Sequence, residues 1–217
     1  MGGAVAATAA SGAFMRRAPV CYVERMPRRP EIRYCSACGS PVTRRVPEGD
    51  THPRHVCEAC GTIHYQNPKV VTGCIPEHEG RVLLCRRAIE PRYGLWTLPA
   101  GFMENGETVA EAAARETLEE ARARVRDLEL YAVFSLPHID QVYVMYRGRL
   151  DPPEFAPGAE SLEVRLMDET EIPWEALAFP VIAETLRRYF ADRRASRFRV
   201  HHAAIVPTAD RSGFIVR

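Results

Sequence analysis

Three glutamates near the middle of the chain have the spacing of neighbours on one side of a helix. Glu116, Glu119 and Glu120 stand at positions i, i+3 and i+4, so a helix would bring their carboxylates together. Like charges at this spacing repel one another by about 0.2–0.5 kcal/mol per pair, and a divalent cation would remove that cost. Magnesium binds both carboxylate and phosphate oxygens, so the group could activate water for attack on a phosphate. Taken alone, however, such a run is more typical of a solvated acidic helix face.

The residues around the three glutamates favour the metal site. The stretch GFMENGETVAEAAARETLEEARA, residues 101–123, resembles the Nudix box Gx5Ex7REUxEExGU, in which U is a bulky aliphatic residue. The matching fixed positions are Gly101, Glu107, Arg115, Glu116, Glu119 and Glu120. Three positions depart from the pattern: Thr117 and Ala123 replace aliphatic residues, and Arg122 replaces glycine. Those positions serve packing and the helix end in the family, so we expect altered local packing with the metal ligands retained.

The resemblance implies a role for the charged residues of the box. Glu116 and Glu120 would be the main ligands of Mg²⁺ or Mn²⁺. Glu119 would be a further ligand or would contact a metal-bound water. Glu107 would pair with Arg115 and orient the helix, and it would also reach the metal through water. We therefore assign Glu107, Arg115, Glu119 and Glu120 to catalysis.

The resemblance also implies ligands outside the helix. The carbonyl oxygen of Ala100, in the loop before the box, would be a further magnesium ligand. Nudix enzymes often take another glutamate, as base or ligand, from a loop after the box. Glu160 is our candidate, with Glu163 of the same GAESLEVR segment as the alternative. An exposed position on a strand explains either residue equally well, because only geometry identifies a positioned carboxylate.

Arginine and aromatic side chains close to the box could bind a substrate. Guanidinium groups bind phosphates through paired hydrogen bonds, although ordinary surface positions explain the arginines equally well. Aromatic rings could stack on a flavin or an adenine, but packing in the core is favoured for each of them. The arginines are Arg86, Arg87 and Arg92, and the aromatic residues are Trp96, Phe102 and Tyr143.

Four of the seven cysteines form two CxxC pairs. Cys35 and Cys38 make the first pair, Cys57 and Cys60 make the second, and a glycine follows each pair. Their spacing matches the C-x2-C-x15–20-C-x2-C pattern of zinc sites. Four thiolates complete the tetrahedral shell of a structural Zn²⁺, so we predict a zinc ribbon with no open position for a substrate. Disulfides or a redox CxxC are the alternatives, but nothing else indicates secretion or a thioredoxin-like context.

The elements that position these residues are predicted from hydrophobic periodicity. A capping box at Thr108 and Glu111 begins a helix over residues 108–125. A hairpin is predicted over 70–87, strands over 128–136, 141–150 and 161–169, and a second helix over about 179–194. The packing side of the first helix is predicted to be Ala110, Ala114, Leu118, Ala121 and Val125.

The expected architecture is α/β. The resemblance implies a Nudix α/β/α sandwich around a mixed sheet, preceded by a small N-terminal zinc ribbon. We expect a leader over 1–30, the ribbon over 31–66, the Nudix domain over 67–193, and a C-terminal tail over 194–217 without a clear pattern. The leader is interpreted as a disordered extension, with a later start or an organelle transit peptide as alternatives.

Composition excludes some classes of protein. The formal net charge is +1, without the basic excess typical of nucleic-acid-binding proteins, so we expect a small nucleotide as the partner and no nucleic acid. No run of about 18 apolar residues is present, so we expect no membrane span and a cytoplasmic protein, or an organellar one if the leader is a transit peptide. Many Nudix enzymes are dimers, so a homodimer is expected by resemblance.

The resemblance indicates Mg²⁺-dependent hydrolysis of the pyrophosphate bond in a nucleoside diphosphate derivative, with FAD or ADP-ribose preferred. NADH is the first alternative, and it is placed second because FSLPHIDQVYVMY replaces the SQPWPFP-type motif of NADH pyrophosphatases. A non-catalytic Nudix regulator with a nucleic-acid-binding ribbon, or a ribbon-led RNA or protein adaptor, remains open. The intact carboxylates of the box argue against the regulator.

Overall fold

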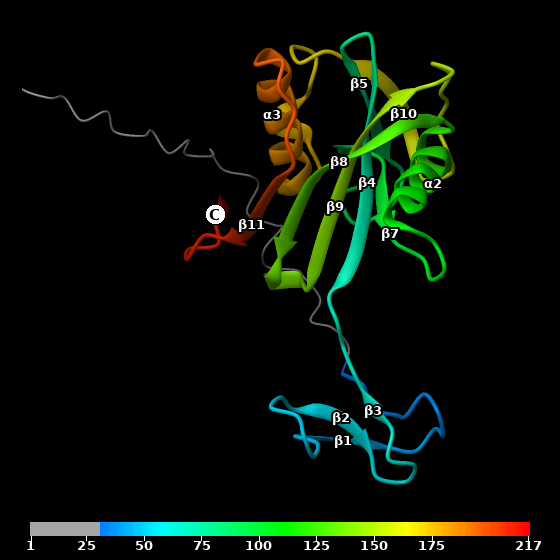
Figure 1. The fold of residues 1–217 in the computed structure, drawn as a ribbon, viewed down its shortest axis with the longest axis vertical. Coiled ribbons are helices and arrows are strands. Elements are labelled where there is room, and N and C mark those ends of the chain that lie inside the picture. The colour runs from blue at the N-terminus through cyan, green and yellow to red at the C-terminus, as the bar shows by residue number, and fades with distance from the viewer. Residues whose placement is uncertain (1–30) are drawn as a thin grey trace, which may run out of the picture.

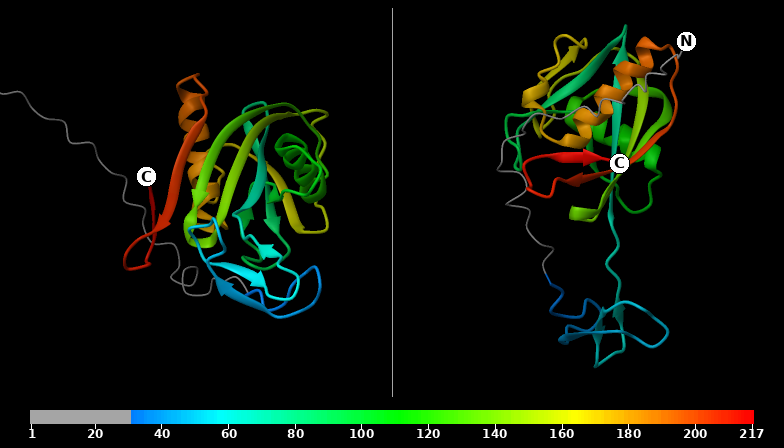
Figure 2. Two further views of the ribbon diagram at one scale, coloured as in Figure 1. Left: turned by 60° about the horizontal axis from the view of Figure 1, so that its bottom comes forward. Right: turned by 90° about the vertical axis from the view of Figure 1, so that its left-hand side faces the viewer.

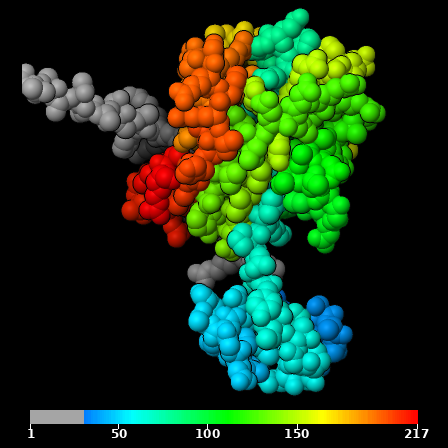
Figure 3. Space-filling view, in the orientation of Figure 1, coloured from blue at the N-terminus to red at the C-terminus, as the bar shows by residue number. Residues whose placement is uncertain are grey.

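A computed structural model describes residues 31–217, and the predicted leader lies outside this range. The first element is a small antiparallel sheet with the strand order β1-β2-β3. Its strands are β1 (Val42–Arg45), β2 (Arg54–Cys57) and β3 (Ile63–His64). An extended segment joins this sheet to the main body of the protein (Figure 1). The space-filling view shows the same segment as a narrow neck (Figure 3).

The main body is built on a mixed sheet, as expected. Within the described residues it has nine strands, in the order β10-β5-β4-β9-β8-β11-β12, with β6 beside β5 and β7 beside β4. The pairs β4–β9 and β8–β11 are parallel, and the other pairs are antiparallel. The strands are β4 (Lys69–His78), β5 (Arg81–Arg87), β6 (Trp96–Thr97), β7 (Ala100–Phe102), β8 (Val125–Leu136), β9 (Gln141–Leu150), β10 (Ser161–Met167), β11 (His201–Pro207) and β12 (Phe214–Val216).

The predicted hairpin is confirmed in β4 and β5. Its turn is Glu79-Gly80, with φ of 46° and 82°, the two positive values that a tight hairpin turn requires. Alternate side chains of β5 belong to different cores: Val82 and Leu84 to the larger one, and Leu83 to the smaller one. Both faces of this strand are therefore buried, as a sandwich requires.

The two α-helices of residues 31–217 cover opposite sides of the curled sheet (Figures 1 and 2). Helix α2 (Val109–Ala121) packs beside β4 and β7, and α3 (Pro180–Arg194) contributes Val181, Ile182 and Leu186 to the larger core. Two short 3₁₀ turns, Pro137–Ile139 and Trp174–Ala176, complete the described elements. No helix in residues 31–217 has the length and apolarity needed to cross a membrane.

Helix α2 ends four residues before its predicted end. Arg122 adopts a left-handed conformation with φ of 49° and closes the helix through its N–H to the carbonyl of Leu118. The Nudix box has glycine at this position because glycine enters the left-handed region without a Cβ clash. The helix-forming residues that follow are overridden, because the chain must turn here to enter β8.

The expectation of a patternless tail is wrong. Strand β11 pairs in parallel with β8 through residues 201–204, and β12 pairs with β11. Ile205 is only 1% exposed and belongs to the larger core. The His201 side chain also contacts Asp192 of α3, with Nε2 to Oδ2 at 2.6 Å. The residues after α3 thus extend the sheet, although a short parallel strand has little local sequence signal.

Candidate active site

The site begins with the N-terminus of α2. Thr108 accepts a hydrogen bond from the N–H of Glu111 at 3.2 Å, and Glu111 accepts one from the N–H of Thr108 at 2.7 Å. This is the predicted capping box, and it satisfies two backbone donors of the first turn. The cap fixes where the helix begins, and hence which way its later glutamates point.

The buried side of α2 differs from the predicted one. Leu118 is 45% exposed, whereas Glu116 and Glu120 are only 8% and 6% exposed. The predicted packing stripe is therefore wrong at Leu118, because the helix turns two of its carboxylates toward the protein interior, whereas Ala121 of the stripe is buried as predicted. Thr117, which replaces an aliphatic residue of the box, is fully buried and donates its hydroxyl to the Ala113 carbonyl at 2.8 Å. That bond satisfies its polar group, so threonine packs where a hydrocarbon is usual.

Gly101 makes room for the Glu116 carboxylate. A Cβ at position 101 would lie 2.3–2.4 Å from the carboxylate carbon and oxygens of Glu116. Strand β7, which contains Gly101, is held against β4 by the pairing of Gly101 with Thr72. The glycine of the box therefore leaves a gap that holds the carboxylate, and a Cβ here would displace that carboxylate.

Arg115 links the acidic residues of the box. It binds Glu107 through two hydrogen bonds, Nε to Oε2 at 3.0 Å and Nη2 to Oε1 at 2.8 Å. Its Nη1 lies 2.7 Å from Glu116 Oε1 and 3.0 Å from Glu119 Oε2. The Phe102 carbonyl accepts another bond at 3.1 Å, which sequence reasoning missed because backbone acceptors have no residue signature. The hydrogen bonds from Arg115 and from a backbone N–H lower the pKa of Glu107 to about 2.

The two buried glutamates form a site suited to a hard cation. Burial raises the pKa of both, and with the nearby charge of Glu116 it raises that of Glu120 to about 8. Oε2 of Glu120 is buried and has no hydrogen-bond partner in the protein. A backbone bond from Ala100 and the charge of Arg87 oppose the rise for Glu120. An oxygen-rich pair with an unpartnered buried oxygen fits Mg²⁺ or Mn²⁺.

The structure distinguishes the two glutamates after the box. The charge of Glu160 raises the pKa values of Glu116 and Glu120, so Glu160 lies within electrostatic range of the pair. Glu163 is instead opposite Arg86 on β5, with carboxylate to guanidinium at 3.8 Å. Of the two, Glu160 is therefore the residue that the fold brings to the carboxylate group.

The three arginines have different surroundings. Arg86 donates to the Gly94 carbonyl at 2.9 Å, which turns it toward the loop after β5. Arg87 donates to the Pro91 carbonyl at 2.9 Å, and its charge acts on Glu120, so it borders the acidic site. Arg92 lies in the same loop with φ of 72°.

The three aromatic residues also differ in their surroundings. Trp96 and Tyr143 are buried in the larger core, which confirms packing for both. Packing is the wrong expectation for Phe102, which is 46% exposed beside the site and has the Lys69 ammonium 4.6 Å from its ring centre.

The ribbon brings its four cysteines together. Their sulfur atoms all lie within 4.8 Å of one another, with Cys35 to Cys60 at 3.6 Å and Cys38 to Cys57 at 3.5 Å. A tetrahedral zinc with Zn–S bonds of about 2.3 Å requires sulfur separations of roughly 3.8 Å. None of these four is in a disulfide. Hydrogen bonds from Thr62 lower the pKa of Cys60 to about 6, toward the thiolate that zinc binds.

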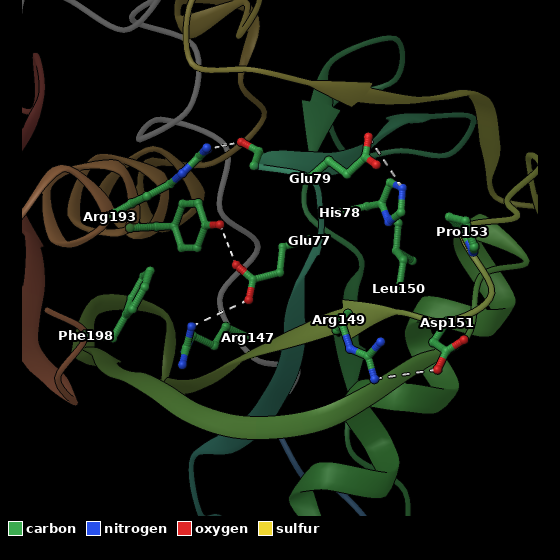
Figure 4. Close-up of a pocket in the computed structure, with 12 residues that line it drawn as sticks. Glu77, His78, Glu79, Arg147, Arg149, Leu150, Asp151, Pro153, Arg193 and Phe198 are labelled. Atoms are coloured by element: carbon green, nitrogen blue, oxygen red, sulfur yellow. Dashed lines mark hydrogen bonds and ion pairs between the residues drawn. The ribbon is translucent and has the colours of Figure 1, made fainter. Parts of the chain in front are cut away.

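A separate cavity of about 580 Å³ lies between the β4–β5 turn, the end of β9 and the last turns of α3 (Figure 4). Its charged groups are paired with one another. Tyr189 donates to Glu77 at 2.5 Å, Arg147 lies 3.5 Å from Glu77, and Arg149 lies 3.6 Å from Asp151. None of the α2 glutamates lines this cavity. The chemistry is therefore assigned to the α2 carboxylates.

Comparison with protein families matches both parts of the chain. Residues 33–66 match a family described as Nudix N-terminal, a zinc ribbon, and residues 67–189 match the NUDIX domain. A Nudix hydrolase structure from Nitrosomonas europaea is 58% identical, with a TM-score of 0.75, and the match covers 80% of this chain and 99% of that one.

Two curated relatives are more distant. An NAD-capped RNA hydrolase of Chromobacterium violaceum is 29% identical over 74% of this chain and 59% of its own length. An ADP-ribose pyrophosphatase of Methanocaldococcus jannaschii is 31% identical over 50% of this chain and 67% of its own length. The match thus spans less than two thirds of the first relative.

Proposed function

The chain belongs to the Nudix family, and on that premise we propose that it hydrolyses the pyrophosphate bond of a nucleoside diphosphate derivative in the presence of Mg²⁺. FAD and ADP-ribose are the preferred substrates. One observation carries the proposal: Glu116 and Glu120 are buried side by side with an oxygen that has no protein donor. A divalent cation would satisfy that oxygen and offset the repulsion of the pair.

The residues around the site have complementary roles in this proposal. Glu116, Glu120 and the Ala100 carbonyl would hold the cation, which when bound neutralises phosphate oxygens and makes a water a better nucleophile. Arg115 holds Glu107 and Glu119 in place through the hydrogen bonds described above. None of these roles requires the ribbon, because its four sulfurs would fill the coordination shell of a structural zinc and leave no position for a substrate.

Two further groups would act on the substrate and on the attacking water rather than on the cation. Arg87 lies within electrostatic range of Glu120 and would bind a phosphate of the substrate through its guanidinium. Glu160 would accept the proton of the attacking water, because it is the post-box carboxylate within range of the metal ligands. Arg86 and Arg92 stay secondary candidates for substrate binding.

The test is a substrate panel with purified protein and Mg²⁺. FAD, ADP-ribose, NADH and a diadenosine polyphosphate are incubated, and the released mononucleotides are separated by chromatography. Glu120→Gln keeps the size of the side chain but removes its charge, so we expect at least a hundredfold loss of turnover. Glu175→Gln, at an exposed position of a 3₁₀ turn, is the matched control. Full activity in Glu120→Gln and Glu119→Gln would refute the site.

A second candidate substrate class is NAD-linked. The Chromobacterium relative is named an NAD-capped RNA hydrolase, which favours NADH or an NAD-capped RNA despite the missing SQPWPFP-type motif. NADH in the panel, together with a short RNA carrying a 5′ NAD, separates this class from FAD and ADP-ribose. Cleavage of either NAD compound with FAD left intact would replace our preferred substrates.

A further inference from the structure

The loop between β9 and β10 crosses the C-terminal end of α2. We call residues 151–160, with the sequence DPPEFAPGAE, the strap. The last carbonyls of a helix lack partners within it, and here the strap supplies donors to two of them. The N–H of Ala156 donates to the Ala121 carbonyl at 2.9 Å, and that of Gly158 donates to the Glu120 carbonyl at 2.9 Å.

Gly158 lies against the helix backbone more closely than any other residue type could. A Cβ at this position would be 1.7 Å from the carbonyl oxygen of Glu119 and 3.1 Å from the carbonyl carbon of Glu120. The φ of Gly158 is outside the left-handed region, so the requirement is for space and not for backbone conformation. Since the obstructing atoms are backbone, they cannot turn aside as a flexible side chain would.

The strap also determines where Glu160 lies. The N–H of Ser161 donates to the Gly158 carbonyl at 3.2 Å, and the Glu160 carbonyl accepts from the N–H of Ala88 at 2.8 Å. The backbone is therefore bound to α2 at Gly158, two residues before Glu160, and the carbonyl of Glu160 itself is bound to the end of β5. The same short segment therefore contacts the backbone of Glu120 and carries Glu160, whose charge acts on the Glu120 carboxylate.

We propose that Gly158 is a positioning residue, whose close contact with the backbone of Glu119 and Glu120 sets the separation between Glu160 and the cation ligands. The part of this inference that concerns the role of Glu160 rests on the proposed function. The part that concerns the placement of Glu120 does not. Glu120 is held at both ends, by Gly158 at its carbonyl and by Ala100 at its carboxylate. A displaced strap would therefore move the ligand and the candidate base together.

The first test compares Gly158→Ala with Gly213→Ala. A Cβ at Gly213, which also has a φ outside the left-handed region, would come no closer than 3.9 Å to any residue beyond its two chain neighbours, so it is the matched control. Mn²⁺ binding is measured by electron paramagnetic resonance without substrate, and kcat and KM are measured on the best substrate of the panel. We expect at least a tenfold weaker Mn²⁺ affinity and a lower kcat for Gly158→Ala, the usual scale for residues that orient ligands. Wild-type Mn²⁺ affinity in a folded Gly158→Ala protein would overturn the inference.

The second test shows whether the effect passes through Glu160. If it does, Gly158→Ala adds little to the kcat loss of Glu160→Gln, since residues that act as a unit are not additive. Fully additive losses would refute this coupling. If Gly158→Ala does not fold, a glycine inserted between Ala159 and Glu160 keeps the close contact and frees the carboxylate. That variant should retain Mn²⁺ affinity and lose kcat, and unchanged kcat would overturn the inference.

These measurements also separate the inference from the proposed function. Mn²⁺ binding needs no turnover, so it reports on the placement of Glu120 even in a protein with no detected substrate. A weakened affinity in Gly158→Ala together with an inactive wild-type protein would refute the proposed function and leave the positioning of the ligand supported. An active wild-type protein, together with unaltered Mn²⁺ affinity and kcat in Gly158→Ala, would support the proposed function and refute the positioning role of Gly158.

Discussion

The buried carboxyl of Glu120 predicts a measurable dependence of stability on pH in the magnesium-free protein. Its pKa is about 8 in the folded chain, against an ordinary value of 4.5. A raised pKa means that the folded state prefers the protonated form of the carboxyl. The contribution of Glu120 to the free energy of unfolding is therefore full below pH 4.5 and is lost as pH rises to 8. Between pH 4.5 and pH 8 the loss in the free energy of unfolding is about 4 kcal/mol, and about 2 kcal/mol of it falls between pH 6 and pH 8.

Urea unfolding at pH 6 and pH 8 measures this contribution in the wild type and in Glu120→Gln. Magnesium is removed by gel filtration and not by a strong chelator, because a chelator would also take zinc from the ribbon. We expect the wild type to lose about 2 kcal/mol more than Glu120→Gln on going from pH 6 to pH 8, because glutamine does not titrate. Added Mg²⁺ should stabilise the wild type more at pH 8, where less of the carboxyl must release a proton.

Equal changes in the free energy of unfolding for wild type and Glu120→Gln would refute the reasoning. That result would mean that water reaches the carboxylate and stabilises its charged form in solution. A smaller Mg²⁺ stabilisation at pH 8 than at pH 6 would separately contradict the assignment of Glu120 as a ligand. Glu184→Gln, a half-buried glutamate on α3 already paired with Arg188 at 2.6 Å, controls for the general effect of removing a carboxylate.

Three further predictions concern other parts of the protein. Glu107 has a lowered pKa of about 2 because Arg115 and a backbone N–H bind its carboxylate, so its stabilising contribution is lost as pH falls from 4.5 toward 2. The free energy of unfolding of Glu107→Gln should depend less steeply on pH in that range than that of the wild type, and an equal dependence would contradict the pairing. Metal analysis should find one zinc per chain, and Cys60→Ser should lose it along with amide protection in residues 54–64, whereas retained zinc would reject the four-sulfur site. Ile205→Ala should destabilise the protein by about 2–5 kcal/mol in urea, and a change near zero would mean that β11 is not part of the core.

Local patterns in the sequence determined the elements and the chemistry of the site. The capping box depends on residues three apart, and the ion pair between Glu107 and Arg115 depends on residues eight apart. Spacings of this kind are set within one helix and its preceding loop, so they can be predicted without a tertiary structure. The zinc ribbon is predictable for the same reason, because two short CxxC turns carry all its ligands.

Only the tertiary structure decided which side of α2 is buried. Hydrophobicity favoured a stripe that included Leu118, yet the fold buries Glu116 and Glu120 instead. The choice depends on β7, where Gly101 leaves room for a carboxylate, and on contacts between segments far apart in the sequence.

The same physical limit applies to Glu160, to β11 and to Gly158. Glu160 and Glu163 are three residues apart with similar neighbours, and the path of the strap separates them. Strand β11 pairs with β8, about 70 residues earlier, and Gly158 is required only because the end of α2 lies against it. Sequence encodes such contacts only through the whole fold, because the free energy that selects them comes from long-range packing and not from local propensity.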